Sequence, residues 1–359
     1  MYKDIPRSEL LKSPLSKKFV KFYNHGQSFI SYKSNFILDG FLFFPIDENT
    51  FTCSDLFCHF EKVNYKKFFT EDFYNMHSNF DVLETIENAF IVGSSRNYYH
   101  SIIDFFPRLF SYKKSIFKDI DKLIIGNDKL KPIFEYLLQK LKIKLEIKII
   151  KNKIYFFKNS VFTINNNFEK INNLYRNTFY DNNLKANKKI FITRKDTFSR
   201  TIINENELIN FLKNNNFEIV NLSKEKFIDQ VKIFNTSKLI VAMHGAGLTN
   251  LLFCKSNTKV IEITENFIQY LNIQDPIYMK LKDKKNIDWF TKKNSSDYNL
   301  YTRSMYNYFS KQNNLDHFFY FAKGDKPSNS FKHKYQEFTY TSLRVDINKF
   351  SNFIKKIQL

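Results

Sequence analysis

The stretch Ser237–Thr264, SKLIVAMHGAGLTNLLFCKSNTKVIEIT, indicates how the chain folds. Its apolar, β-branched run at 239–242 is typical of a strand that is buried on both faces. A turn at 244–247 follows, and we expect a helix over 248–253 and a second strand over 259–263. Strand, glycine turn, helix and strand form a βαβ unit, whose helix N-terminus offers N–H groups to an anion such as phosphate.

Glycine usage bears on this turn. The chain holds only 7 Gly in 359 residues, and two of them lie within the four positions 244–247. Glycine is needed where the backbone approaches another group closely or takes a positive φ. The alternative is a tight turn that merely packs a helix on a sheet. One short glycine motif does not decide between the two, so other motifs have to be considered.

Length and charge indicate the class of protein. A chain of 359 residues exceeds the usual size of one domain, so we expect two. Its 42 Phe and 21 Tyr can fill two cores. The net charge of +20 indicates an anionic partner, which can be nucleic acid, an acidic membrane surface or a phosphorylated substrate. Lys, Asn, Ile and Phe are all abundant, as in AT-rich coding sequences, so part of the charge is expected on solvated faces.

Cysteine usage and hydropathy favour a cytoplasmic protein. Cys53, Cys58 and His59 lack the second ligand pair of a zinc site, so we expect unreactive thiols in a reducing compartment. The sequence shows no apolar N-terminal region and no run of 18 apolar residues. Peripheral contact with an anionic membrane surface, at the inner face of the cell membrane, is helped by the lysines of segment 17–21.

Strands alternate with helices along most of the chain, which predicts an α/β fold with parallel sheets. In the first half we expect strands at 89–93, 122–126, 145–150 and 154–157, and a helix at 132–141. In the second half we expect strands at 189–193 and 217–220 and helices at 205–215 and 226–234, with Asn-rich 164–173 between the halves. Ligands of such sheets sit beyond the carboxyl ends of the strands, where Arg194 and His244 are expected to face one crevice.

A second informative stretch is Asn97–Phe110, NYYHSIIDFFPRLF. On a helix, His100, Asp104 and Arg108 share one face. Pro107 should kink the helix or start a new one. A carboxylate one turn from an imidazole can fix its tautomer and raise its basicity, as a general base requires. The alternative is a structural network in which Asp104 pairs with Arg108 and His100 caps the helix.

Three ordered segments, covering about residues 89 to 265, resemble glycosyltransferase family 61. The first, Asn97 to Leu109, is similar to the family pattern N-Y-x-H-W-x-x-D-x-x-P-R-L, with Ser101 where the family usually has Trp. This departure affects the acceptor-side wall. The second segment contains Arg194, Arg200, Asn204 and Glu205. The third consists of His244, Gly245, Ala246, Gly247, Leu248, Thr249 and Asn250, followed by Glu262. Three ordered motifs are more specific than any one.

The resemblance implies a GT-B architecture, in which two Rossmann-like domains face each other across a cleft. Residues 1–165 would form the acceptor-side domain, with 1–80 as an irregular β-rich extension. Residues 166–335 would form the domain that binds the nucleotide sugar. Residues 336–359 include a terminal helix, capped by Asp346, that is expected to pack back on the N-terminal domain.

The resemblance also implies an inverting, metal-independent transfer of a sugar from a nucleotide sugar, with UDP favoured, to a hydroxyl of a glycan or glycolipid. Capsular or other surface polysaccharide, or lipooligosaccharide, is the expected product. The resemblance thus implies no cofactor or metal. A metal-dependent GT-A enzyme would need Asp-x-Asp at the end of a strand, whereas Asp119-Ile120-Asp121 precedes a strand and is typical of a solvated turn. The alternatives are a sialyl- or fucosyltransferase-like enzyme and a basic module that binds nucleic acid or glycan without catalysis. With the glycosyltransferase favoured, no nucleic acid partner is expected.

Roles for the motif residues follow from their chemistry. Arg194 and Arg200 can offer forked donors to the diphosphate. Glu262 could accept from ribose hydroxyls, and His244 could donate to a phosphate or the sugar. The base would be Asp104 or His100, as a coupled pair, with Asn97 and Arg108 on the acceptor side. Beyond residue 270, Tyr306 and other aromatic residues suit a sugar pocket or, as the favoured interpretation, core packing.

Overall fold

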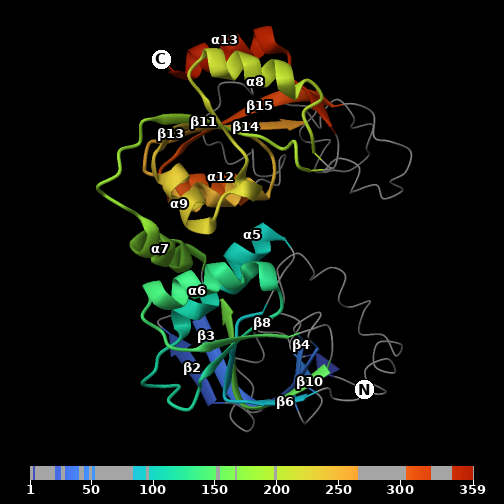
Figure 1. Cartoon of the computed structure of the whole chain (residues 1–359), viewed down its shortest axis with the longest axis vertical. Helices are drawn as coiled ribbons and strands as arrows, with labels where there is room; N and C mark the ends of the chain where they lie inside the picture. The colour runs from blue at the N-terminus through green and yellow to red at the C-terminus, as the bar shows by residue number, and fades with distance from the viewer. Residues whose placement is uncertain are drawn as a thin grey trace, which may run out of the picture. The chain divides into compact units, whose positions relative to one another are not determined.

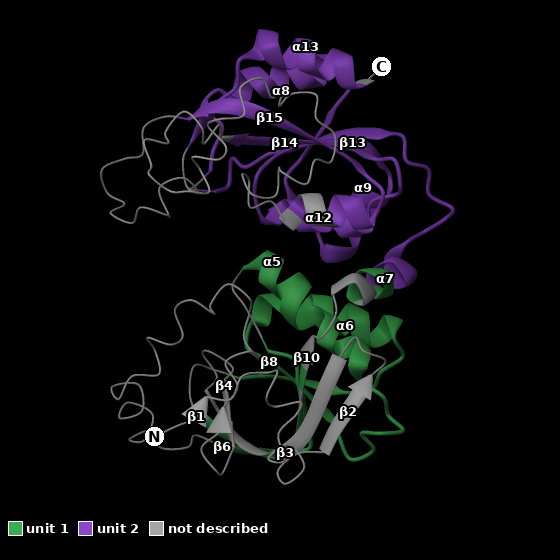
Figure 2. Ribbon diagram, turned by 180° about the vertical axis from the view of Figure 1, so that it is seen from behind, with its two compact units in different colours: residues 1–174 green, residues 175–359 purple. Residues whose placement is uncertain are grey.

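The structure is a computed structural model of the chain. It describes residues 3–4, 21–25, 29–39, 44–47, 51–52, 84–93, 97–150, 154–165, 168–197, 200–265, 305–324 and 342–358. The chain divides into two compact units, residues 1–174 and 175–359, which are coloured separately in Figure 2. Both are α/β units built on sheets rich in parallel strands, as the sequence predicts.

Unit 1 contains a mixed sheet to which eight strands contribute among the described residues, in the order β2-β3-β10-β7-β8-β9, with β4 beside β3 and β6 beside β10. The strands are β2 Lys21–His25, β3 Phe29–Asp39, β4 Phe44–Asp47, β6 Glu84–Glu87, β7 Ala89–Ile91, β8 Lys122–Ile125, β9 Glu146–Ile149 and β10 Ile154–Asn165. Strand β10 is parallel to β6 and β7, and β8 is parallel to β7 and β9, whereas β3 lies antiparallel to β10. The described strands of the first 80 residues thus extend the same sheet, while β1 (Lys3–Asp4) and β5 (Phe51–Thr52) pair with each other.

The connection from β7 to β8 is irregular. It consists of one helical turn α5 (Tyr98–His100), a π-helical turn η3 (Ser101–Phe105) and a 3₁₀-helix η4 (Phe106–Ser111). The expected effect of Pro107 is confirmed, since it lies in the first turn of η4. The next connection carries η5 (Asp128–Leu130) and the expected helix α6 (Lys131–Lys140).

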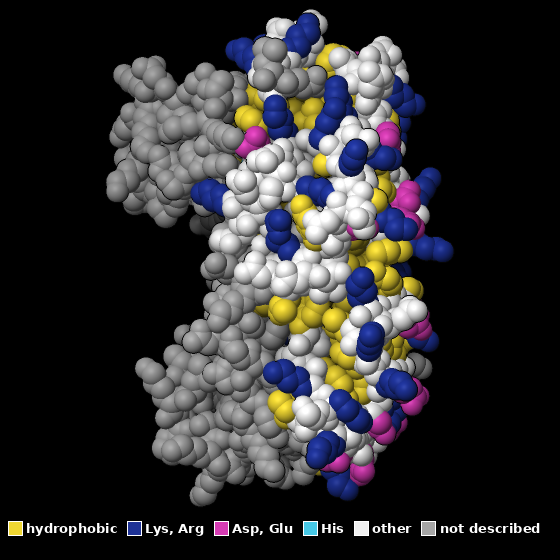
Figure 3. Space-filling model, turned by 90° about the vertical axis from the view of Figure 1, so that its left-hand side faces the viewer, with side chains coloured by type: hydrophobic (Ala, Val, Ile, Leu, Met, Phe, Trp, Pro, Cys, Tyr) yellow, Lys and Arg dark blue, Asp and Glu magenta, His cyan; other side chains and the backbone are white. Residues whose placement is uncertain are grey.

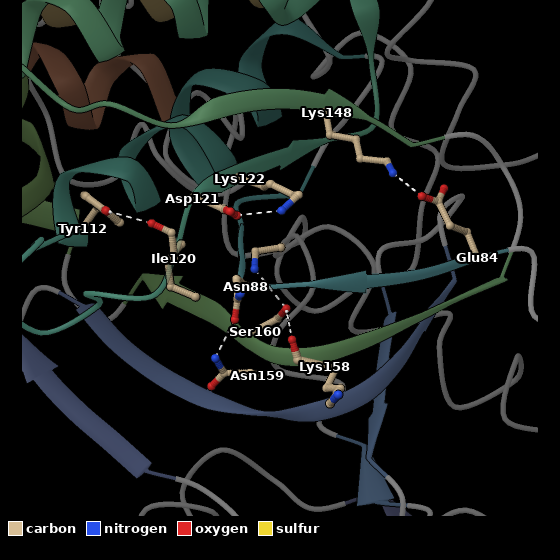
Figure 4. Close-up of polar contacts among 11 residues, drawn as sticks. Glu84, Asn88, Tyr112, Ile120, Asp121, Lys122, Lys148, Lys158, Asn159 and Ser160 are labelled. Atoms are coloured by element: carbon tan, nitrogen blue, oxygen red, sulfur yellow. Dashed lines mark hydrogen bonds and ion pairs between the residues drawn. The ribbon is translucent and has the colours of Figure 1, made fainter.

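Two asparagines in the left-handed region divide the strands where β6 and β7 both pair with β10 (Figure 4). Asn88, with φ 57°, separates β6 from β7, and Asn159, with φ 48°, bends β10. Asn tolerates this conformation better than most residues. The Asn159 Nδ2 donates to Asn88 Oδ1 over 2.6 Å, and the Ala89 N–H donates to Ser160 Oγ over 3.1 Å. Strand β10 can therefore pair with β6 and then with β7.

Unit 2 contains a sheet that the described residues form in the order β12-β11-β13-β14-β15-β16. The strands are β11 Lys188–Ile192, β12 Glu218–Val220, β13 Ser237–Met243, β14 Lys259–Glu265, β15 Asp316–Gly324 and β16 Leu343–Arg344. All neighbours are parallel except β15 and β16. Counted along the chain, the parallel strands run 2-1-3-4-5, so the order reverses between β11 and β13. Doubly wound sheets bind ligands beyond the carboxyl ends of the strands at such a point.

Helices cover both faces of this sheet (Figure 1). On one face lie α8 (Glu205–Asn214) and α13 (Ile347–Gln358), and on the other lie α9 (Phe227–Asn235) and α12 (Met305–Gln312). The turn after β13 opens directly into the 3₁₀-helix η7 (Ala246–Phe253), and η6 (Leu222–Lys224) follows β12. Phe191 and Val241 of the strands pack with Leu208 of α8 in one buried core. The βαβ unit predicted from 239–263 is confirmed.

The structure corrects two expectations about packing. Helix α13 was expected on the N-terminal domain, but its apolar residues, Phe350 and Phe353 among them, belong to the core of unit 2. Its cap was correctly predicted, since the Lys349 N–H donates to Asp346 Oδ1 over 3.0 Å. The Asn-rich segment 164–173, expected between the domains, does adjoin the boundary between the units at Leu174, but it forms regular structure, since β10 continues to Asn165 and helix α7 (Phe168–Phe179) contains residues 168–173.

The physical reason for the second correction is periodicity. Ile171, Tyr175 and Phe179 recur every four residues and are buried, so α7 has an apolar face despite its asparagines. The boundary between the units at Leu174 lies inside this helix.

Lys and Arg side chains are scattered over the face that Figure 3 presents, among apolar and uncharged groups. The Lys and Arg side chains that this face shows are therefore dispersed and do not form a single patch. Within the described part of the chain, no helix has both the length and the apolarity to cross a membrane.

Candidate active site

Arg194 lies against the glycine turn at the point where the strand order of unit 2 reverses. It follows β11, whereas Gly245 follows β13. A Cβ atom at Gly245 would clash with the Arg194 guanidinium, at Nη1. The backbone of Gly245 is extended, with φ 166°, so the close approach and not the conformation requires glycine. The glycine content of this turn predicted that its backbone closely approaches another group. That group is the guanidinium of Arg194.

Two arginines lie next to each other in this region. The Arg194 Nε donates to the Arg200 carbonyl oxygen over 2.9 Å, and Arg200 takes a left-handed φ of 56°. Burial, followed by the charge of Arg200, lowers the pKa of Arg194 to about 10. Arg194 therefore stays protonated at neutral pH, although its site disfavours the charge. A bound anion would relieve both penalties, so this pair favours an anionic ligand.

Glu205 and Asn204 support this loop from α8. Glu205 is buried, and its Oε1 accepts from the Arg194 N–H over 3.0 Å and from Thr193 Oγ1 over 2.8 Å. The Asn204 amide exchanges two hydrogen bonds with the Val345 backbone, of 2.8 and 3.0 Å. Both were expected to bind the nucleotide sugar directly. Their polar atoms instead hold protein groups, so they position Arg194 and α8.

His244 belongs to a chain of polar groups that runs into the core. Its Nδ1 lies 2.5 Å from Glu262 Oε1, and His317 Nε2 lies 2.9 Å from Glu262 Oε2. Ser310 Oγ lies 2.7 Å from His317 Nδ1. Burial by itself would raise the pKa of Glu262, but the hydrogen bonds with His244 and His317 outweigh it and lower the pKa to about 2. Glu262 is therefore ionised at neutral pH.

This geometry corrects the expected role of Glu262. Its side chain is 0% exposed and both oxygens bind imidazoles, so it cannot accept from ribose hydroxyls. Glu262 can act on a ligand only through His244, whose side chain is 25% exposed. His317 and Ser310 are the functional candidates that sequence reasoning missed, since neither lies in a recognisable motif.

Tyr306, from α12, lies beside the same imidazole. Its ring centroid is 5.3 Å from that of His244. Burial, followed by the charge of Glu262, raises the pKa of Tyr306, so its phenol stays protonated as a hydrogen-bond donor. The favoured interpretation from sequence was core packing. The structure shows that Tyr306 is indeed buried, but in electrostatic contact with Arg194 and Arg200 of the candidate site.

The helix η7 presents only its first residues to this region. Leu248, Thr249 and Asn250 were expected at the nucleotide sugar, but all three are buried. Asn250 Nδ2 donates to Gln230 Oε1 over 2.9 Å, which ties η7 to α9. Ala246 and Gly247 are only partly buried and open the helix, where backbone N–H groups lack partners within the helix.

Unit 1 contains the second expected cluster. His100 Nδ1 lies 2.7 Å from Asp104 Oδ2, and the two side chains are 13% and 18% exposed. This confirms the pairing expected from their spacing. Helical segments of π type occur frequently at functional sites, and Asp104 lies in one.

Arg108 and Asn97, which flank this pair in the sequence, form hydrogen bonds with main-chain groups. Arg108 is buried, and it donates to the carbonyl oxygens of Asp104 and Val92 over 2.9 and 3.1 Å. Asn97 caps α5, since its Oδ1 accepts from the Tyr99 N–H over 2.9 Å. Arg108 therefore bonds to the main chain of Asp104, while the carboxylate of Asp104 holds His100. Burial and these bonds argue against its expected contact with an acceptor.

Comparison with known proteins identifies the family. Residues 98–261 match the family model described as Glycosyltransferase 61. Over these residues the chain is similar to glycosyltransferase family 61. The matched region contains the His100–Asp104 pair, the two arginines and the glycine turn, and it ends one residue before Glu262.

Three relatives are "EGF domain-specific O-linked N-acetylglucosamine transferase" proteins. The protein of Bos taurus is 36% identical over 96 residues, which cover 25% of this chain and 18% of the relative. Those of Rattus norvegicus and Pan troglodytes are 36% and 39% identical over 80 residues, covering 21% of this chain and 15% of each relative. The matches thus span less than a fifth of the length of these relatives.

Proposed function

We propose that this chain transfers a sugar from a nucleotide sugar to a hydroxyl group of a glycan or glycolipid. The observation that carries the proposal is the contact of Arg194 with Gly245, beside Arg200, at the reversal point of a doubly wound sheet. Two cations at this place suit the diphosphate of a nucleotide sugar. UDP is the favoured carrier. Because the relatives are named N-acetylglucosamine transferases, N-acetylglucosamine is the first sugar to test.

The hydrogen-bond donors and positive charges of unit 2 would act on the leaving diphosphate. Its charge grows as the glycosidic bond breaks, so fixed donors stabilise the transition state more than the ground state. Arg194 and Arg200 supply positive charge, His244 supplies an Nε2–H when both of its ring nitrogens carry protons, and the N-terminal end of η7 supplies backbone N–H groups. In this proposal the arginines take the part that a metal ion plays elsewhere, so activity should survive EDTA.

The acceptor would be activated in unit 1. We assign the general base to the His100–Asp104 pair, which takes a proton from the acceptor hydroxyl while that hydroxyl attacks the anomeric carbon. A single displacement of this kind inverts the anomeric configuration. It needs both units at one donor, which is the GT-B arrangement that the family resemblance implies. Surface polysaccharide or lipooligosaccharide assembly at the cytoplasmic face is the proposed setting.

The deciding experiment is a thermal-shift screen of the whole chain against UDP, GDP, CMP and their sugars, followed by product analysis with the best donor. We expect UDP and UDP-N-acetylglucosamine to raise the melting temperature. The Arg194→Gln protein should lose this response, whereas Arg176→Gln, which removes a partly buried arginine that bonds to Asn313, should keep it.

Other outcomes would identify the alternatives. A response to CMP or GDP sugars alone would favour a sialyl- or fucosyltransferase-like enzyme. No response to any nucleotide, together with strongly salt-dependent retention on RNA or DNA, would contradict the proposal and favour a nucleic-acid-binding module.

A further inference from the structure

The buried end of the histidine chain in unit 2 has no role in the reaction described above. Its four members come from separate places: Ser310 from α12, His317 from β15, Glu262 from β14, and His244 from the turn after β13. His317 and Glu262 are 0% exposed, and Ser310 is fully buried as well. A buried chain of polar groups costs free energy unless each group has a hydrogen-bond partner, so a functional reason for this chain is worth seeking.

The hydrogen bonds fix where the protons lie. An ionised carboxylate can only accept, so Glu262 requires a proton on His244 Nδ1 and another on His317 Nε2. The second nitrogen of His317, Nδ1, is held by the Ser310 hydroxyl over 2.7 Å. His317 therefore cannot rotate without losing both contacts.

The same bonds fix the outer histidine. With Nδ1 of His244 committed to Glu262, Nε2 is the nitrogen that can meet a ligand. Among the described residues, the charged or titratable groups around His244 include Glu262, in direct contact, Tyr306, whose ring lies beside it, and the arginines 194 and 200, which act on Tyr306. Two cations close by favour an anion in front of this nitrogen.

We propose that His317 and Ser310 are positioning residues, which act through Glu262 to keep a proton on His244 Nδ1 and to aim Nε2 at the diphosphate, to which Nε2 donates when it carries a second proton. This inference rests on the proposed nucleotide-sugar function for the identity of the ligand. The state of the His244 ring, however, can be measured without any ligand. Partners that orient a ligating histidine from behind typically change affinity or activity by about 10- to 100-fold when removed.

The test compares two substitutions of His317. In His317→Gln an amide N–H₂ can still donate to Glu262, whereas in His317→Phe the buried Oε2 loses its donor. Imidazole ¹⁵N NMR of the ligand-free protein reads the tautomer of His244, and calorimetry reads the affinity for UDP. We expect wild type and His317→Gln to show the Nδ1–H form. We expect His317→Phe to show mixed tautomers and about tenfold weaker UDP binding.

A second pair of variants keeps the inference testable if His317→Phe does not fold. Ser310→Ala removes the hydroxyl behind His317, and Ser237→Ala removes an equally buried hydroxyl that donates only to the Ile233 carbonyl oxygen. We expect changed imidazole signals for His317 and His244, and weaker UDP binding, in the first alone. An unchanged His244 tautomer in the folded variants would overturn the inference. Failure of UDP to bind wild type would instead count against the proposed function, while the NMR result still decides the inference.

Discussion

Each unit contains one histidine hydrogen-bonded through Nδ1 to a carboxylate, but the two pairs differ in their surroundings. In unit 1, His100 and Asp104 lie one turn apart on the same irregular helix, and both are partly exposed. In unit 2, His244 follows β13 and Glu262 lies within the neighbouring strand β14, and the carboxylate is fully buried between two imidazoles. A partly exposed carboxylate can exchange a proton with an acceptor hydroxyl, whereas one with a pKa of about 2 and no exposure cannot. A histidine–carboxylate pair can thus serve as a base or as an orienting device, depending on how exposed its carboxylate is.

The largest effect is expected from Asp104→Asn. If the unit 1 pair is the base, turnover should fall by about 10²- to 10⁴-fold, the usual contribution of general acid–base catalysis. UDP affinity should be unchanged, because the donor groups lie in unit 2. Steady-state rates with the best donor, together with calorimetry, provide the measurement. A folded Asp104→Asn protein with wild-type turnover would exclude Asp104 as the base and remove the contrast between the two pairs.

Glu262→Gln should mainly lower the stability of the folded protein, in contrast to Asp104→Asn, whose expected effect is on turnover. The pKa of Glu262 falls from 4.5 to about 2 in the folded protein, which corresponds to about 3 kcal/mol of stabilisation at neutral pH. The folded protein binds this proton more weakly than the unfolded chain does. The stabilisation is therefore complete above about pH 4.5 and disappears as the pH falls toward 2.

Urea unfolding at several pH values measures this effect. The gap in unfolding free energy between wild type and Glu262→Gln should be widest at pH 7 and narrow below about pH 4.5. Glu225→Gln, at an exposed position of the same unit, should show only a small gap. An equal gap at pH 7 and pH 3 would mean that Glu262 is not the buried carboxylate described here.

The contrast between the two pairs also explains why the sequence predicted the contact in unit 1 but not the contact of Glu262 with His317. His100 and Asp104 are four residues apart, so helical periodicity alone brings them together. The contact of Glu262 with His317 depends on β14 lying beside β15, in the register that pairs Val260 with His317. No local pattern specifies which strand becomes the neighbour of β14. The turn after β13 was predictable because its glycines are rare in this chain, but their partners, such as Arg194, were not.

Helix α13 illustrates the same limit. Its amphipathic pattern and its Asp346 cap are local and predictable, whereas the sheet that receives its apolar face is a matter of tertiary packing. Family resemblance placed it on the wrong domain for this reason. The side chains of Asn204 and Glu262 were likewise assigned to a ligand, because sequence motifs do not distinguish a residue that touches the ligand from one that holds its neighbour.

Gly245→Ala tests whether Arg194 of unit 2 binds the diphosphate of the nucleotide sugar. The added methyl group would displace the Arg194 guanidinium, so we expect UDP affinity to fall by about tenfold or more, comparable with the loss of one charge-assisted hydrogen bond. Gly247→Ala is the matched control, since its methyl group would meet the Leu222 Cδ1 at 2.9 Å, at the flexible end of a side chain. Equal UDP affinity in wild type and Gly245→Ala would show that Arg194 does not bind the diphosphate.

Asn97→Ala should give the smallest effect and separates a structural from an acceptor role on the unit 1 side. Asn97 caps α5 through its bond with the Tyr99 N–H, and loss of an N-cap usually costs about 1 kcal/mol of stability. Chemical unfolding should show that loss in Asn97→Ala and its recovery in Asn97→Asp, because aspartate also caps. The His100–Asp104 bond is intact in either case, so turnover per folded molecule should stay near wild type. If turnover falls in Asn97→Ala while stability does not, the side chain contacts the acceptor, and the exposed pair in unit 1 has a third functional member comparable with His317 in unit 2.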